Sequence, residues 1–157
     1  MSYNRRVGRE CALKMLYALK LEREQVNPGR LLDSFWDNFR FADDALGEPL
    51  DSAEAPLATS TRIFAETLVK GVVEYRPVLD RKISEVAKNW SLERMTPVDL
   101  SILRMSAYEL LYLPEIPVSV SINEAIEIAK RYGTEESAAF INGLLDKIAK
   151  NVEKGSH

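Results

Sequence analysis

The stretch from Thr96 to Tyr112 constrains the fold most, because it predicts a helix that is apolar on almost every side. Thr96 is suited to the N-cap and Pro97 to the first helical position, whereas Pro114 cannot continue the helix. A helix that is apolar most of the way round is normally covered by neighbouring elements. We therefore expect this helix to lie at the centre of the fold.

Apolar residues recur at helical spacing in six further segments. These segments are residues 4–24, 31–40, 61–75, 77–90, 121–132 and 135–152. Residues 118–122 alternate like a strand, but the run is short and we find no second strand for it to pair with. The sequence predicts an all-α fold of about seven helices, in a compact bundle of two helical subdomains around the central apolar helix.

The length of 157 residues fits one domain. We expect a single helical domain over residues 1–157, with an N-terminal subdomain at about 3–75 and a C-terminal subdomain at about 77–152. Residues 42–60 carry five acidic residues and no basic one, together with glycine and proline. They are predicted to form an acidic linker that is longer than most loops.

Composition excludes several classes of protein. The net charge of −3 argues against a generally basic nucleic-acid binder, and we expect neither a membrane span nor a signal peptide. The single cysteine, Cys11, fits a reducing cytoplasm and lies on an apolar helical face, which favours a buried thiol.

Residues that carry chemistry are scarce. The only histidine is His157, and no glycine-rich phosphate loop is present, so we expect no catalytic site, metal or cofactor. The remaining class of function is a module that binds RNA, protein or both.

The start of the first predicted helix is locally basic. Arg5, Arg6, Arg9 and Lys14 stand against Glu10, an excess of three positive charges. Positive side chains at a helix N-terminus oppose the helix dipole. They form either a solvated, slightly unfavourable helix end or a group that holds an outside anion such as phosphate.

Two details bear on the C-terminal helices. Ser121 and Glu124 have the spacing of a capping box, which predicts a helix start at Ser121. Asn142 and Gly143 are embedded in helical periodicity, where a glycine costs about 1 kcal/mol relative to alanine. Close approach of another backbone or of a ligand would justify that cost.

An ordered series of motifs runs through most of residues 3–150. It comprises RRVGRECAL at 5–13, LY at 16–17, PVD at 97–99, ILR at 102–104, AYEL at 107–110, IPV at 116–118, INEA at 122–125, AKRYG at 129–133 and FINGLLDK at 140–147. This series resembles the NusB family of bacterial transcription antitermination factors, and it is most specific across 97–148.

The resemblance implies a fold, a function and a set of partners. Members of the family are all-helical, with two subdomains, and bind the single-stranded element boxA of ribosomal RNA transcripts together with a ribosomal protein that acts as NusE. That pair joins NusA, NusG and RNA polymerase to help transcription of ribosomal RNA operons pass termination signals. The resemblance therefore implies a cytoplasmic, non-enzymatic factor.

The resemblance also assigns residues. RNA-binding positions are Arg5, Arg6, Arg9, Phe140, Asn142 and Lys147, and partner-binding positions are Tyr17 and Asp99. Phe140 offers a stacking plane for a base, although core packing would also explain it. Asp99 has an alternative reason to be acidic, since it stands near the start of the central helix.

Two other interpretations are kept. The family often places a basic residue before the aromatic, where this chain has Ala139. This departure motivates the alternative of a helical homodimer or protein adaptor without RNA binding. A related helical domain precedes ribosomal RNA methyltransferases, but this chain ends before a cofactor-binding domain could begin, so we rank an enzyme last.

Overall fold

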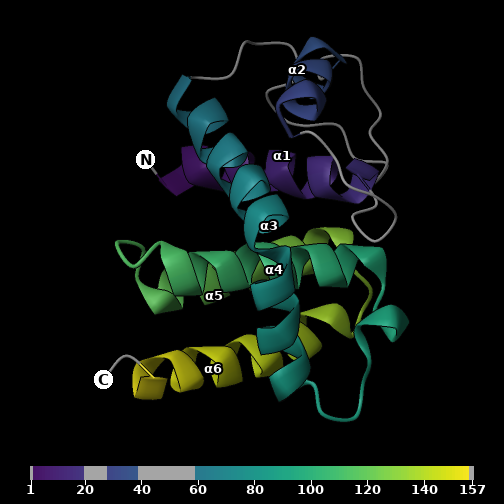
Figure 1. The fold of residues 1–157 in the computed structure, drawn as a ribbon, viewed down its shortest axis with the longest axis vertical. Helices are drawn as coiled ribbons and strands as arrows, with labels where there is room; N and C mark the ends of the chain where they lie inside the picture. The colour runs from purple at the N-terminus through teal and green to yellow at the C-terminus, as the bar shows by residue number, and fades with distance from the viewer. Residues whose placement is uncertain (1, 20–27, 39–58, 156–157) are drawn as a thin grey trace. The chain divides into compact units, whose positions relative to one another are not determined.

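The structure is a computed structural model, and it describes residues 2–19, 28–38 and 59–155. They form α1 (Ser2–Leu19), α2 (Pro28–Asn38), α3 (Thr59–Val86), α4 (Pro97–Tyr112), α5 (Val118–Tyr132) and α6 (Ser137–Gly155), with a 3-10 turn at Leu92–Arg94 (Figure 1). No strand occurs within those three ranges. The prediction of an all-α fold is confirmed for the described residues.

The described residues form six α-helices instead of about seven, because the segments predicted at 61–75 and 77–90 are joined in α3, but the predicted break between them is present as a kink. α3 has 28 residues and is kinked, with non-helical backbone angles at Tyr75 (φ −104, ψ 16) and a proline at Pro77. A proline inside a helix removes one hydrogen bond and clashes with the preceding turn, which bends the helix without ending it.

The predicted acidic linker at 42–60 falls mostly outside the described residues, which exclude 39–58. Thr59 and Ser60 are not part of a linker, because they form the first turn of α3. Among the described residues, no helix is long and apolar enough to cross a lipid bilayer.

The chain divides into two compact units, an N-terminal unit (Met1–Val73) and a C-terminal unit (Glu74–His157). In the N-terminal unit, α1 packs closely against the first part of α3 at Gly8. A Cβ atom at Gly8 would lie 3.0 Å from Phe64 Cδ2 and 3.2 Å from the carbonyl oxygen of Thr61. A side chain larger than glycine at this position would therefore require the ring of Phe64 or the backbone of Thr61 to shift.

The buried side of α1 includes the single cysteine. Cys11, Leu13 and Met15 are fully buried. Burial raises the pKa of the Cys11 thiol to about 12, so the thiol stays neutral and unreactive at physiological pH. The expectation of a buried Cys11 is confirmed.

In the C-terminal unit, α4 is the apolar helix expected from the sequence. Thr96 caps it by accepting a hydrogen bond from the backbone N–H of Asp99 at 3.1 Å, and Pro97 is the first helical residue. Almost every residue from Asp99 to Leu110 is buried, and α4 contacts both α5 and α6 (Figure 1). This element of the prediction is confirmed from cap to last residue.

The predicted capping box at Ser121 is wrong. α5 begins at Val118, directly after Pro117, so Ser121 already lies inside the helix. Its hydroxyl donates a hydrogen bond of 2.8 Å to the buried carboxylate of Glu109 on α4. Ser121 therefore joins two helices and satisfies a buried acid, which a local spacing rule could not indicate.

Three tyrosine rings stack beside the kink in α3. The ring centroid of Tyr75 lies 4.3 Å from that of Tyr112 and 6.2 Å from that of Tyr108, with 5.3 Å between the latter two. Stacked rings at these distances are favourable beyond their burial. Because Tyr75 has the non-helical angles, this stack stabilises the residue at which α3 bends.

Candidate nucleic-acid interface

The three arginines predicted to face an anion differ in exposure. Arg5 and Arg6, in the first turns of α1, are exposed, whereas Arg9 is only 2% exposed. The sequence predicted one exposed group of three guanidinium groups. The described residues offer two at the surface, while Arg9 lies in the interior of the helix packing.

Arg5 and Arg9 meet at one aromatic ring. The guanidinium carbon of each lies 5.2 Å from the centroid of Phe64, a half-buried residue of α3. A cation above an aromatic face is attracted by the negative charge of that face, and it keeps its own full charge. The ring therefore holds a guanidinium group in place without neutralising it.

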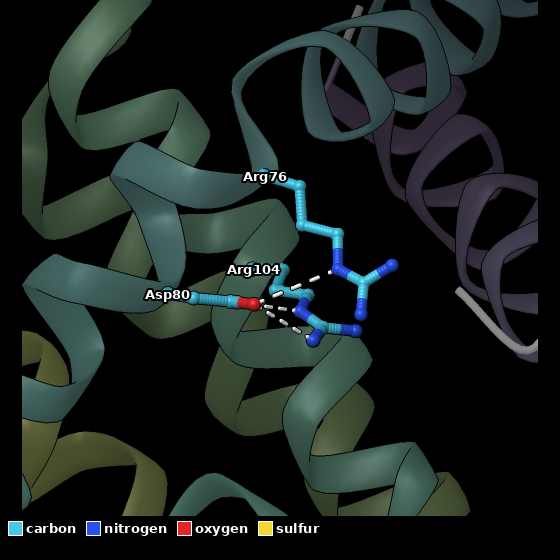
Figure 2. Close-up of polar contacts among 3 residues, drawn as sticks. All are labelled: Arg76, Asp80 and Arg104. Atoms are coloured by element: carbon cyan, nitrogen blue, oxygen red, sulfur yellow. Dashed lines mark hydrogen bonds and ion pairs between the residues drawn. The ribbon is translucent and has the colours of Figure 1, made fainter. Parts of the chain in front are cut away.

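The C-terminal unit contains a different arginine arrangement, on residues that the sequence did not assign to any site. Arg104 on α4 donates from Nε to Asp80 Oδ1 at 2.8 Å and from Nη2 to Asp80 Oδ2 at 3.0 Å (Figure 2). Arg76 approaches the same carboxylate, with Nε 3.6 Å from Oδ2. Asp80 and Arg76 are on α3, so this network fastens α3 to α4.

The three positions predicted on α6 do not form one cluster. Phe140 is half-buried, and Asn142 and Lys147 are exposed. With about 100° of rotation per residue, Phe140 and Lys147 share one side of the helix two turns apart, and Asn142 lies about 160° from Phe140. The exposed residues Ala139 and Gly143 lie on the arc between them.

Gly143 has an open surface. A Cβ atom built there would meet nothing within 4 Å. The close approach of another backbone that the sequence suggested is therefore not made by the described part of this chain.

The two residues predicted to bind a protein partner have different surroundings. Tyr17 is half-buried on α1. Asp99 is only 8% exposed, and its Oδ1 atom is buried with no hydrogen-bond partner among the described residues. A buried carboxylate oxygen normally accepts at least one hydrogen bond, so Oδ1 of Asp99 is an exception among the described residues.

The predicted residues are divided between the two units. The N-terminal unit contains Arg5, Arg6, Arg9 and Tyr17, and the C-terminal unit contains Asp99, Phe140, Asn142 and Lys147. Within each unit, the structure brings Arg5 and Arg9 to one ring and places Phe140 and Lys147 on one side of α6. Phe64 was missed by sequence reasoning, because it is 55 or more positions from both arginines and reads as a core residue.

Comparison with known families gives one result over nearly the whole chain. The model of the NusB family matches residues 6–150. The transcription antitermination protein NusB of Syntrophotalea carbinolica is 52% identical over 146 residues, which cover 93% of this chain and 92% of the relative. The protein of the same name from Geobacter sulfurreducens is 48% identical over 152 residues, covering 96% and 98%.

Solved structures agree on the fold. NusB of T. maritima superposes with a TM-score of 0.73 at 36% identity, covering 93% of this chain and 90% of that one. A NusB chain from a complex of the antitermination factors NusB and NusE with dsRNA gives a TM-score of 0.74 at 24% identity, covering 96% and 99%. At that identity the second likeness concerns the fold alone.

Proposed function

This chain belongs to the NusB family, and from that premise we propose that it is an antitermination factor that binds boxA-type single-stranded RNA together with a ribosomal protein acting as NusE. In this role it joins NusA, NusG and RNA polymerase and promotes processive transcription of ribosomal RNA operons in the cytoplasm. The role is that of a binding protein, not of an enzyme.

The observation that carries the RNA-binding proposal is the pair of exposed arginines at the start of α1. Arg5 and Arg6 are exposed, and Arg5 is placed over a ring that leaves its charge intact. Guanidinium groups bind phosphate oxygens strongly, often through two hydrogen bonds. Arg9, which the resemblance also assigns to the RNA, is buried and lies over the same ring as Arg5.

Residues of α6 supply base recognition in this proposal. Sequence-specific binding of single-stranded RNA uses stacking on aromatic rings and hydrogen bonds to base edges. The half-buried ring of Phe140 can stack with a base, and the exposed Lys147 on the same side of α6 can reach a phosphate. Asn142 lies on the opposite side of α6 from Phe140, and its exposed amide can form hydrogen bonds with a base edge there.

The protein partner is assigned to Tyr17 and Asp99. In this proposal Asp99, which is 8% exposed, accepts a hydrogen bond from the ribosomal protein through the part of its carboxylate that reaches the surface. A charge-assisted hydrogen bond of this kind is about twice as strong as a neutral one. The half-buried Tyr17 provides a ring and a hydroxyl for the same partner.

Fluorescence titration of labelled boxA-type RNA, with and without the ribosomal protein, tests the proposal. We expect binding that tightens when the partner is added and weakens steeply with salt, and no comparable gain for a scrambled RNA of equal length. A partner that leaves the RNA affinity unchanged would contradict the proposal.

The variant Asp99→Asn separates the two kinds of contact. It keeps the shape of the side chain and removes the charge, so we expect RNA binding by the protein alone to persist. The gain in affinity from the partner should fall. An undiminished gain would remove Asp99 from the partner surface.

The alternative function is a homodimer or adaptor that does not bind RNA. It is favoured by the exposed Ala139 at a position where the family often has a basic residue. Light scattering with and without boxA-type RNA discriminates the two, because an RNA-indifferent dimer would support the adaptor.

A further inference from the structure

The ring of Phe64, on α3, lies against two of the predicted RNA-binding arginines, Arg5 and Arg9. We propose that Phe64 is a positioning residue for RNA binding. Its ring holds the guanidinium group of Arg5 in an orientation in which that group can contact a phosphate of the RNA. This inference rests on the proposed function and extends the binding surface from α1 to α3.

The ring itself is held firmly. Its Cδ2 atom lies so close to Gly8 that a Cβ atom there would be 3.0 Å away, and Gly8 also faces the backbone of Thr61 and Ala65. An aromatic ring fixed between two helices is a rigid support, whereas an exposed arginine side chain has many rotamers. Contact with the ring already restricts the side chain of Arg5 in the free protein. Arg5 therefore loses less conformational entropy when it binds RNA.

The choice of an aromatic support has an electrostatic consequence. A carboxylate in the same place would order Arg5 equally well, but it would cancel the charge that attracts phosphate. The ring avoids this for the exposed Arg5.

Replacement of the ring tests the inference. We expect Phe64→Leu to weaken boxA-type RNA binding about two- to tenfold, the cost of immobilising one long side chain. Phe64→Tyr retains an aromatic face and should restore affinity to within about twofold. Arg62→Ala is the matched control, because Arg62 is an exposed arginine of α3 placed over a different ring, that of Trp36, at 4.7 Å.

A double-mutant cycle shows whether Phe64 acts through Arg5. Arg5→Ala should cost more RNA affinity in the wild-type background than in the Phe64→Leu background. Equal costs in the two backgrounds would overturn the inference while leaving the proposed function intact. Failure of the wild-type protein to bind boxA-type RNA would instead overturn the proposed function.

A measurement on the wild-type protein covers the case in which Phe64→Leu does not fold. Nitrogen-15 relaxation of the arginine side chains should show that the Nε–H bond of Arg5 is more ordered than that of Arg81, an exposed arginine of the C-terminal unit. Equal mobility of Arg5 and Arg81 would overturn the inference without any variant.

Discussion

The arginines of the two units have different kinds of partner. In the C-terminal unit, the buried Arg104 makes two hydrogen bonds to the carboxylate of Asp80, which Arg76 also approaches. In the N-terminal unit, Arg5 and Arg9 lie over the ring of Phe64. The first arrangement neutralises charge inside the fold, whereas in the second the guanidinium groups lie over a ring that supplies no counter-charge of its own.

This difference shows that the partner of an arginine, more than its presence, indicates its role. A buried guanidinium group without a counter-charge is very unfavourable, so Arg104 requires Asp80 to be there at all. An exposed guanidinium group on a ring remains available to an outside anion. We therefore assign Arg104 to stability and Arg5, with its exposed neighbour Arg6, to binding.

The largest expected effect is that of Asp80→Ala. Removal of this carboxylate leaves Arg104 buried without its counter-charge, which should lower the free energy of unfolding by about 3–5 kcal/mol. Chemical denaturation measures this loss. Where the variant remains folded, the salt dependence of RNA binding should be unchanged, since neither Asp80 nor Arg104 faces RNA in our proposal.

Glu85→Ala is the control for Asp80→Ala. Glu85 is an exposed acid of the same helix that approaches Lys82 at 4.0 Å. Loss of such an exposed pair should change the free energy of unfolding by less than about 1 kcal/mol. A similar small effect of Asp80→Ala would contradict the contrast between the two units.

Gly8→Ala comes next in magnitude. Its Cβ atom would press on the ring of Phe64 and on the carbonyl oxygen of Thr61, and overpacking of this kind costs about 1–3 kcal/mol. Thermal and chemical unfolding should both report the loss. A neutral result would show that the ring can move aside, which would weaken the case that Phe64 is a rigid support.

The sequence predicted what depends on neighbours along the chain. The cap at Thr96, the proline at position 97 and the all-round apolar pattern are local signals, and α4 follows them. The hydrogen bonds between Arg104 and Asp80 join residues 24 positions apart, and no periodicity indicates such a pair. Fold class could therefore be predicted, whereas the connections between helices could not.

The same limit explains why the burial of Arg9 and the start of α5 were not predicted. A helical wheel of α1 places Arg9 on one side of the helix but does not reveal that Arg9 is buried with its guanidinium group over Phe64 of α3. The spacing of Ser121 and Glu124 fits a cap, but Pro117 starts α5 earlier and Glu109 binds the Ser121 hydroxyl. In both cases a contact with a distant helix decides the role of a residue that local pattern had assigned.

Gly143→Ala should have a smaller effect, and of opposite sign to Gly8→Ala. The new methyl group meets no atom of the described residues within 4 Å, so the free energy of unfolding should rise by about 0.5–1 kcal/mol, the advantage of alanine over glycine in a helix. If RNA or the ribosomal protein approaches α6 closely, this stabilised variant should bind that partner more weakly. Unchanged binding of both would leave the glycine without a functional reason.

Arg6→Ala is expected to have the smallest effect on stability. In contrast to Asp80→Ala, it should change RNA binding and leave the free energy of unfolding nearly unchanged. Because Arg6 is exposed, the free energy of unfolding should change by less than about 0.5 kcal/mol. RNA binding should weaken, and the slope of log affinity against log salt should fall by about 0.7, the value for one phosphate contact on a single strand. Arg81→Ala, the same change at an exposed position of the C-terminal unit, should leave that slope unaltered. An unchanged slope in Arg6→Ala would remove Arg6 from the RNA surface. Arg5 would then be the exposed arginine that still supports the contrast between RNA binding in the N-terminal unit and the stabilising role of Arg104.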